Sequence, residues 1–304
     1  MKPTKKELSA WKLKNPKIIK RFTEGVENES YLIYDGDKKY VFRRIKEGWN
    51  IGIPKMKKDD IFKVLEKLSV ESVPRPTRTK KKELINPTKP RRTALLEYIP
   101  GRTFKKRFPN LREIELIADS HSGLTKNLKK IKPISKFDNP RIFLSKEELN
   151  KIRRHKQINH KLTLQAYNFV KFEYKKINWV KLKKQIVHND IQKENAIIFN
   201  KRIGIIDFDD LAYGYVAYDL SKALLSLCIT KKFDTKKASR YLEIYQKRIR
   251  LNNEEKKALL ILMITWVLWK IKESLLEKSE ELPSLKNTMK ELRALMKLKS
   301  KICL

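Results

Sequence analysis

The sequence predicts an α+β chain of two lobes, in which strands and helices are segregated along the sequence. β-prone segments cluster before residue 101, whereas segments with helical periodicity dominate after it. Pro100-Gly101 separates the two regions, because neither residue readily continues a strand or a helix. We therefore predict a small β-rich lobe at residues 1–100 and a larger, mostly helical lobe at residues 101–304. With 304 residues and 40% hydrophobic content, the chain can bury a large core.

The smaller lobe is expected to begin with a helix and a β-hairpin. Residues 1–16 are basic and helix-prone, and Pro16 ends this predicted helix. The pattern then becomes β-like, with Tyr31–Tyr34 and Tyr40–Phe42 on either side of Asp35-Gly36-Asp37. An Asp-Gly pair between two such runs is a strong signal for a hairpin turn.

One helix and two further strands complete the predicted smaller lobe. Residues Asp60–Leu68 place their apolar side chains on one helical face, and Val73-Pro74-Arg75-Pro76 ends that helix. Leu84-Ile85 and Thr93–Ile99 are predicted as short strands.

The larger lobe is predicted to combine helices with a few strands around one polar segment. Gln185–Val187, Ala196–Phe199 and Ile203–Ile206 are apolar and β-prone. Ser145–Ile158 begins with a Ser-x-x-Glu capping box, which predicts a helix there. Further helices are predicted over residues 160–176, 215–230, 236–250, 253–277 and 283–298.

Cysteine usage and apolar patterning favour a cytoplasmic protein. Cys228 and Cys303 are too few and too far apart for a disulfide framework or a zinc site. Residues 1–20 carry charges but no continuous apolar run of the kind a secretory signal needs. Ala258–Trp269, the longest apolar run, is shorter than the ~20 residues of a membrane span and predicts a buried helix.

The chain is strongly basic, with 72 Lys and Arg against 35 Asp and Glu and a net charge of +37. Such a field concentrates anions, so one interpretation is a polyanionic partner such as nucleic acid or an anionic lipid surface. The other is a coding bias towards Lys, Ile and Asn that leaves bases on solvated faces. No nucleic-acid-binding motif is visible. We expect at most weak, nonspecific association with anionic polymers.

Residues 188–210 carry the strongest functional signal. Asp190 follows His188 and is itself followed five positions later by Asn195, and Asp207 comes after a short hairpin-like segment. Phosphoryl transfer needs a carboxylate to orient an acceptor hydroxyl and oxygen ligands to hold Mg²⁺ on the phosphates. Turn and cap chemistry is the alternative explanation for these residues. This alternative is disfavoured because burying polar groups at the ends of apolar strands costs free energy, and such groups are seldom retained without a function.

On these motifs the chain resembles the aminoglycoside phosphotransferase and choline kinase-like family, a branch of the bilobal protein-kinase-like fold. The strong matches are His188–Asn195, Ile206–Asp210 and Tyr218–Leu220. The Asp-Phe-Asp-Asp form most resembles the homoserine kinase and stress-response kinase branches. Three weaker similarities lie upstream. Glu24–Glu29 resembles the loop over the nucleotide phosphates, and Leu95–Gly101 resembles the hinge between the lobes, at 96–101. Ala118–His121 resembles a helix motif that opens the larger lobe.

The resemblance implies a role for each matching residue. Asp190 would be the catalytic base, Asn195 and Asp207 would be catalytic residues that hold the metal, and His188 would brace the loop. Asp219 would either support the loop by accepting backbone hydrogen bonds or be an ordinary acid at a helix start. The implied cofactors are ATP and Mg²⁺. The implied nucleotide-binding residues are Gly25, Asn28, Val41, Arg43, Glu97 and Ile99.

The phosphate-binding cation is less certain from the sequence. Strand alternation puts Val41 and Arg43 on one face and Arg44 on the other, which favours Arg43 where kinases usually have Lys. Arg44 remains the alternative. The acidic partner expected on the next helix is open among Asp59, Asp60 and Glu66. Asp209 is interpreted as a solvated turn residue rather than a metal ligand.

Ile206–Asp210, which the resemblance assigns to metal binding, is called the metal motif below, and the spacing after it bears on the phosphate acceptor. Only about ten residues separate Asp207 from the helix expected near Tyr218, which leaves little room for a peptide-docking segment. A small hydroxylated metabolite, such as an amino-alcohol, homoserine-like compound or sugar, is therefore the expected acceptor. The alternatives are a Ser/Thr protein kinase of the stress-response type and a nucleotide-binding pseudokinase-like interaction protein. The positive charge disfavours polycationic aminoglycosides.

Overall fold

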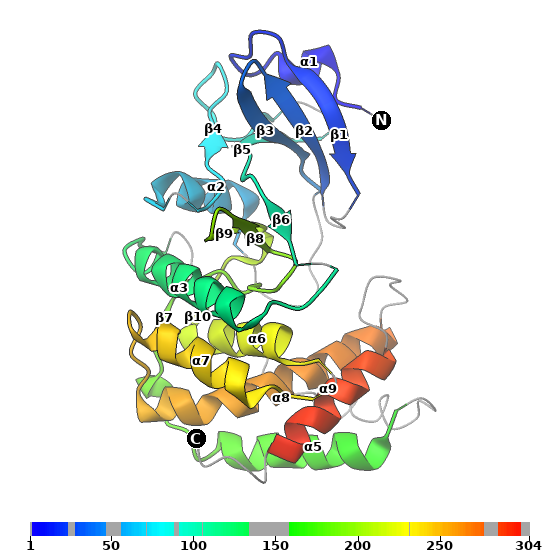
Figure 1. Cartoon of the computed structure of the whole chain (residues 1–304), viewed down its shortest axis with the longest axis vertical. Coiled ribbons are helices and arrows are strands. Elements are labelled where there is room, and N and C mark those ends of the chain that lie inside the picture. Colours follow the sequence, from blue (N-terminus) through cyan, green and yellow to red (C-terminus); the bar gives the residue numbers. More distant parts are fainter. Residues whose placement is uncertain are drawn as a thin grey trace.

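The computed structural model describes residues 2–23, 28–46, 56–70, 72–87, 91–104, 106–133, 158–230, 232–276 and 285–298. Two lobes follow one another along the long axis of the molecule, with the strand-rich N-lobe at one end and the helical C-lobe at the other (Figure 1). The segregation of strands and helices that the sequence predicts is therefore confirmed.

The N-lobe is built on a five-stranded antiparallel sheet. Its strand order is β1 (Lys17–Phe22), β2 (Glu29–Asp35), β3 (Lys38–Arg44), β5 (Thr93–Glu97) and β4 (Pro76–Thr77). The predicted hairpin joins β2 to β3 through Gly36, which has a φ of 60° that suits glycine. One face of the sheet carries a small separate cluster of buried side chains: Leu8, Trp11, Tyr31, Ile33, Phe42 and Leu95.

Two predictions for this lobe are wrong. Helix α1 covers only Lys5–Leu8 instead of residues 1–16, because Trp11 leaves the helix to pack edge-on against Phe42. The indole Nε1 of Trp11 also donates a hydrogen bond of 2.9 Å to the carbonyl oxygen of Thr77. Leu84-Ile85 forms no strand, since the chain turns there and pairs with β5 only through an isolated bridge from Asn86.

Helix α2 (Lys58–Lys67) lies beside the sheet and faces the C-lobe (Figure 1). Ile61, Phe62, Val64 and Leu65 form its buried side, which agrees with the predicted apolar face. The chain then crosses between lobes at Gly101, whose φ is 123°. A Cβ at this position would approach the carbonyl oxygen of Ile198 to 2.4 Å, so the crossing requires glycine.

Short strands of the C-lobe carry the polar segment between residues 188 and 210. Strand β7 (Lys184–Val187) pairs with β10 (Ala212–Tyr215), and β8 (Ala196–Phe199) forms a hairpin with β9 (Arg202–Ile205). The three predicted strands are confirmed. The sequence did not predict β10, nor the two-residue strand β6 (Arg102–Thr103), which extends the hairpin.

The rest of the C-lobe is helical. Its longer helices are α3 (Leu111–Leu128), α5 (His160–Tyr174), α6 (Val216–Cys228), α7 (Thr235–Gln246), α8 (Asn253–Leu276) and α9 (Leu285–Leu298), with short 3₁₀ turns η1 (Trp179–Lys181) and η2 (Phe208–Asp210). The predicted helix Ser145–Ile158 lies outside the described residues except at Ile158.

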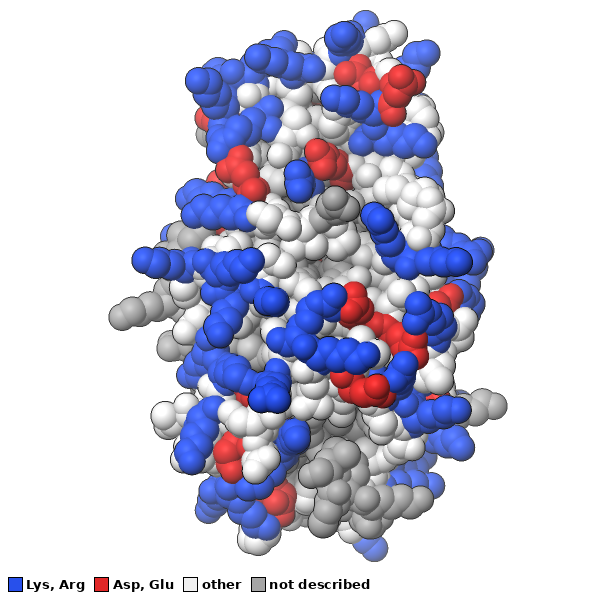
Figure 2. Space-filling view, turned by 60° about the vertical axis from the view of Figure 1, so that its left-hand side comes forward, with Lys and Arg blue, Asp and Glu red and all other residues white. Residues whose placement is uncertain are grey.

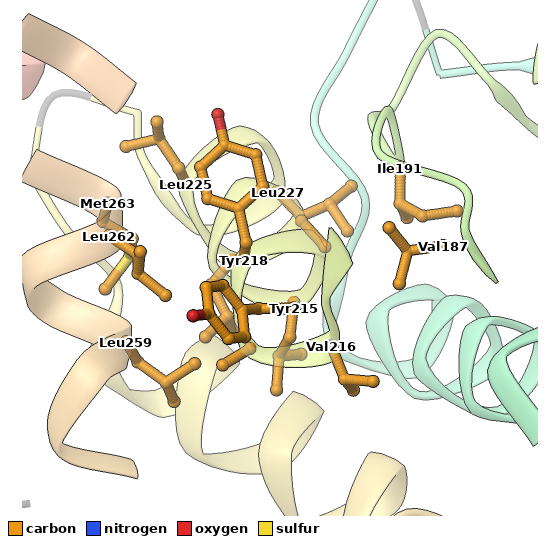
Figure 3. Packing of buried hydrophobic residues seen from close by; sticks show 14 of the residues in the cluster. Val187, Ile191, Tyr215, Val216, Tyr218, Leu225, Leu227, Leu259, Leu262 and Met263 are labelled. Atoms are coloured by element: carbon orange, nitrogen blue, oxygen red, sulfur yellow. The ribbon is translucent and has the colours of Figure 1, made fainter. Parts of the chain in front are cut away.

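Helix α6 lies at the centre of the C-lobe core and is buried along nearly its whole length. Figure 3 shows Tyr215, the residue just before this helix, directed towards Leu259 and Leu262 of α8, and Tyr218 of the helix beside Leu225 and Leu227. The core therefore fixes the helix that follows the metal motif. No helix among the described residues is both long and apolar enough to cross a membrane.

Candidate active site

A cleft of about 420 Å³ lies between the two lobes. Apolar side chains from both lobes line its walls, which suits a flat aromatic ring. Charged side chains of both lobes also line it, among them Arg43 and Asp207. Six of the residues predicted from the sequence line this one cleft: Val41, Arg43, Glu97, Ile99, Asn195 and Asp207.

The loop after β7 is braced by His188, which is completely buried. Its Nδ1 accepts a hydrogen bond of 3.2 Å from the backbone N–H of Asp190, and its Nε2 donates to the carbonyl oxygen of Ile206 at 3.2 Å. This pattern requires a neutral ring with its proton on Nε2. Burial lowers the pKa of His188 to about 4, so the ring stays neutral near pH 7. The bracing role predicted for His188 agrees with these contacts.

Asp219 supports the same loop from the first turn of α6. Its Oδ1 accepts a hydrogen bond of 2.7 Å from the backbone N–H of Asn189, while its Oδ2 lies 3.0 Å from Nε2 of His121 on α3. The Nδ1 of His121 in turn lies 2.8 Å from the hydroxyl of Tyr241 on α7. Burial would raise the pKa of Asp219, but the neighbouring His121 and the hydrogen bonds lower it overall. Of the two alternatives for Asp219, the structure shows the loop-supporting contact.

Asp190 lies at the end of this braced loop with its side chain 23% exposed. Its Oδ2 accepts hydrogen bonds from Nδ2 of Asn195 at 2.6 Å and from Nε2 of Gln192 at 2.9 Å. Burial raises the pKa of Asp190 to about 7, and the charges of Asp210 and Asp207 add to the rise while Lys222 opposes it. A carboxylate with a pKa near neutrality can take up and release a proton at physiological pH.

Lys222 is a site residue that the sequence analysis missed. Its Nζ lies 4.0 Å from Oδ1 of Asp190, donates a hydrogen bond to the carbonyl oxygen of Asn189, and lies 4.0 Å from the ring centroid of Trp266. The side chain is almost fully buried. The sequence could have pointed to Lys222 only through its position, one helical turn after Asp219. With 72 Lys and Arg in the sequence, one lysine at that spacing does not stand out.

Asn195 and Asp207 provide oxygen atoms on the C-lobe wall. The backbone N–H of Ile206 donates to the carbonyl oxygen of Asn195 at 3.0 Å, which holds the two residues close together. Because Nδ2 of Asn195 is engaged by Asp190, the amide oxygen is the atom that can serve as a metal ligand. Carboxylate and amide oxygens suit a hard divalent cation. In the described part of the chain, no group of three or more His, Cys, Asp and Glu side chains forms a separate metal site.

Arg43, and not Arg44, reaches the cleft. Nη1 of Arg43 lies 3.1 Å from Oδ2 of Asp209, and its Nη2 lies 3.7 Å from Oδ1 of Asp207. Arg44 extends from the other face of β3 and pairs with Glu7 at 2.7 Å and Glu29 at 3.0 Å. Strand alternation therefore predicted the correct one of the two arginines to face the cleft.

The carboxylate beside Arg43 does not come from α2. Asp59 pairs with Arg92 at 2.7 Å, Asp60 with Lys63 at 3.2 Å and Glu66 with Arg78 at 2.6 Å.

That carboxylate belongs to Asp209 of the metal motif. Its side chain is 9% exposed and contacts Arg43, Lys58 and Asn28. The interpretation of Asp209 as a solvated turn residue is therefore wrong. It failed because all three partners come from distant parts of the sequence.

The remaining predicted nucleotide residues lie in different surroundings. Gly25 is outside the described residues. The side chain of Asn28 donates to Asp209 and accepts a hydrogen bond from the backbone N–H of Lys46. It is thus engaged with the protein and is not among the residues that line the cleft.

The hinge between the lobes is held from both sides. The backbone N–H of Glu97 donates to the carbonyl oxygen of Arg75, and that of Tyr98 donates to the carbonyl oxygen of Lys39. Ile99 packs against Gly204, where a Cβ would approach its Cγ2 to 2.5 Å. The hinge segment is therefore fixed at the back of the cleft.

The two-lobed fold, the braced loop and the carboxylates that face a basic side chain across one cleft are the features of a phosphotransferase of the kinase type. A family model described as phosphotransferase enzyme family matches residues 18–256. The chain belongs to this family, which confirms the resemblance seen in its motifs. No curated protein sequence matches the chain.

Solved structures show the same fold. A microcompartment-associated aminopropanol kinase is similar with a TM-score of 0.69 and 14% identity, over 97% of this chain and 96% of that one. An aminoglycoside phosphotransferase from Alicyclobacillus acidocaldarius also has a TM-score of 0.69 and 14% identity, over 97% and 94%. A choline kinase from Cryptosporidium parvum has a TM-score of 0.59 and 17% identity, over 94% and 90%. The protein-kinase-like fold predicted from the sequence is thereby confirmed.

Proposed function

We propose that this protein transfers the γ-phosphate of ATP, with Mg²⁺, to a hydroxyl group of a small molecule. The observation that carries this proposal is the convergence of side chains from both lobes on one cleft. Arg43 reaches it from the N-lobe, while Asn195 and Asp207 reach it from the C-lobe beside Asp190. Phosphoryl transfer depends mainly on positioning and electrostatics, and these side chains can provide both.

The proposal assigns a separate role to each polar residue at the cleft. Asp190 orients the acceptor hydroxyl and receives its proton, a role that suits a carboxyl with a pKa of about 7. Arg43 binds phosphate oxygens through its planar fork. Asn195 and Asp207 hold the divalent cation, which neutralises charge on the phosphates when bound.

Nucleotide and divalent metal use are also supported by related structures. The solved structure of an amicoumacin kinase with 15% identity and a TM-score of 0.66 is a complex with AMP-PNP, Ca²⁺ and Ami. A spectinomycin phosphotransferase with 15% identity was crystallised with ADP and spectinomycin. We assign Mg²⁺ to this chain because two protein oxygen ligands leave most of the coordination to phosphates and water, as Mg²⁺ prefers.

The length of the connection after the metal motif supports a small acceptor. Strand β10 and the start of α6 at Val216 follow Asp207 closely, and β10 pairs with β7 inside the C-lobe. This connection is too short to contain the long segment on which protein kinases dock a peptide. This favours a small hydroxylated acceptor over a peptide.

A screen of phosphate acceptors tests this function. Purified protein with ATP and Mg²⁺ is incubated with amino-alcohols, homoserine, neutral sugars, aminoglycosides and a generic protein substrate, and ADP formation is measured. We expect ADP formation that depends on one of the small hydroxylated compounds. Turnover with the protein substrate alone would favour the stress-response type of protein kinase. Nucleotide binding without turnover on any acceptor would favour the pseudokinase-like interpretation.

A further inference from the structure

Asp209 forms an ion-pair cluster that bridges the two lobes in the lining of the cleft. Its Oδ2 lies 3.1 Å from Nη1 of Arg43 on β3, and its Oδ1 lies 3.0 Å from Nζ of Lys58 in the first turn of α2. Nδ2 of Asn28, at the start of β2, donates to the same Oδ2. One carboxylate of the metal motif thus contacts three separate segments of the N-lobe.

The charges in this cluster are arranged unusually for a kinase, in which a lysine on β3 pairs with a glutamate on the following helix. Here the helix contributes a cation, Lys58, and the carboxylate comes from η2 in the C-lobe. Asp59, Asp60 and Glu66, the acids of α2, pair with basic residues away from the cleft.

Arg43 lies between two carboxylates that have different tasks. Asp209 is the nearer at 3.1 Å, and Asp207, the proposed metal ligand, lies 3.7 Å away on Nη2. Without Asp209, the guanidinium would be drawn towards Asp207 and would compete there with a divalent cation. The contact with Asp209 therefore keeps Arg43 available for phosphate oxygens and Asp207 available for the metal.

The cluster is shielded from water enough for these contacts to be strong. The side chains of Asp209, Lys58 and Arg43 are 9%, 17% and 18% exposed. Solvent screening is weak at such positions compared with that at the surface. Arg43 and Lys58 balance the charges of Asp209 and Asp207, so a divalent cation on Asp207 would leave this group of side chains positive and able to attract phosphate oxygens.

We infer that Asp209 and Lys58 are positioning residues that replace the helix carboxylate of other kinases and separate the phosphate-binding Arg43 from the metal-binding Asp207. This inference rests on the proposed function. It extends it by linking the placement of α2 directly to the metal motif. Any movement of α2 relative to the C-lobe shifts Lys58 relative to Asp209 and thereby alters the ion pair between Asp209 and Arg43.

Moving the carboxylate from η2 to α2 tests the inference. In Asp209→Asn, Arg43 shifts to Asp207, and we expect the Mg²⁺ concentration for half-maximal effect on nucleotide binding to rise about tenfold or more. Nucleotide binding measured without metal should change much less. In Lys58→Glu/Asp209→Asn, a carboxylate on α2 can pair with Arg43, so most of the loss should be recovered. The binding of a fluorescent ATP analogue, titrated with Mg²⁺, measures both effects.

Two matched substitutions control for charge and stability. Asp60→Asn removes another buried carboxylate that pairs with lysine on α2, and Lys67→Glu reverses an exposed charge at the end of the same helix. Both should leave the Mg²⁺ dependence unchanged. The thermal unfolding midpoint of each variant shows whether it is folded.

The inference is overturned if folded Asp209→Asn keeps the wild-type Mg²⁺ dependence, or if the double variant is as impaired as the single one. Wild-type protein that binds no ATP analogue at all would instead contradict the proposed function, so the two failures are distinguishable.

Discussion

At the residue scale, Asp207 has a backbone conformation that few non-glycine residues adopt. Its φ of 63° and ψ of 73° lie in the left-handed region. Hydrogen bonds on the preceding residue hold it there, since Ile206 donates to Asn195 and accepts from His188. Strain of this kind persists only where the surroundings determine it, and it is typical of functional sites. The result is a carboxylate directed into the cleft beside Asn195.

The proposed roles of Asp190 and Asp207 predict different kinetic effects. Asp190→Ala should lower the rate of phosphate transfer by about 10²–10⁴-fold, because the proton acceptor is lost, while Mg-ATP binding stays nearly intact. Asp207→Ala should also weaken Mg-dependent nucleotide binding by at least about tenfold. Steady-state turnover and equilibrium nucleotide titrations measure the two quantities. Wild-type turnover in either variant would contradict the assignments.

Glu7 predicts a pH dependence of stability in the N-lobe. Its hydrogen bond with Arg44 lowers the pKa of Glu7 to about 2. Because the folded-state pKa is depressed, this pair stabilises the fold above the unfolded pKa of about 4.5, and its contribution disappears as pH falls towards 2. Glu7→Gln should therefore be less stable than wild type by about 1–2 kcal/mol at pH 7. The difference in urea midpoint should shrink between pH 4.5 and 3, and a constant difference would refute the assignment.

At the element scale, α3, α6 and α7 form a scaffold that holds the loop after β7. His121 of α3 joins Tyr241 of α7 to Asp219 of α6, and Asp219 holds the backbone of Asn189. The geometry of the loop thus depends on helices that do not touch the cleft. His121 and Tyr241 therefore act on the loop through Asp219 and do not line the cleft.

Two substitutions within α3 separate this connection from the stability of the helix itself. His121→Ala removes one of the two partners of the buried Asp219 carboxylate and should destabilise the protein by about 3 kcal/mol. Gly123→Ala should stabilise it by about 0.5–1 kcal/mol, because a Cβ there meets no atom within 4 Å. Urea denaturation measures both. Equal stabilities of His121→Ala and wild type would show that the connection is dispensable.

Elements that the sequence predicted well are those whose signal is local. The hairpin at Gly36 and the strands around residues 185–206 follow from side-chain alternation and turn chemistry. The two-residue strands Pro76–Thr77 and Arg102–Thr103 could not be predicted, since each exists only through a distant partner strand.

The same distinction applies to the site. Asp190, Asn195 and Asp207 belong to one motif with a recognisable spacing and could be identified from sequence. The environment of Asp209 depends on Asn28, Arg43 and Lys58, which are brought together only by the tertiary fold. A local pattern cannot show that a carboxylate will be buried by side chains from another lobe.

At the scale of the whole molecule, the cleft lies within a strongly positive protein. Figure 2 shows Lys and Arg side chains spread over the whole visible face, with acidic groups between them and no single basic patch. On this face the basic side chains are thus dispersed, and the net charge of +37 gives the protein a general positive field. We expect such a field to repel cationic acceptors.

This field predicts the ranking of acceptors. Kanamycin-type aminoglycosides should be poor substrates compared with neutral or anionic hydroxylated compounds. Because salt screens charges beyond about 10 Å at 0.1 M, raising the ionic strength should lower the KM for aminoglycosides more than for neutral acceptors. Initial rates over a series of salt concentrations test this. Efficient use of aminoglycosides at low salt would refute the argument.

Following the labelled γ-phosphate of ATP tests the central claim most directly. Wild-type protein is incubated with Mg²⁺, γ-labelled ATP and the acceptor panel, and the label is then traced to small molecules, protein or inorganic phosphate. The account predicts that the label appears on a small hydroxylated compound in step with ADP formation, and that Asp190→Ala abolishes this transfer. Label found only on protein, or equal transfer by wild type and Asp190→Ala, would contradict it.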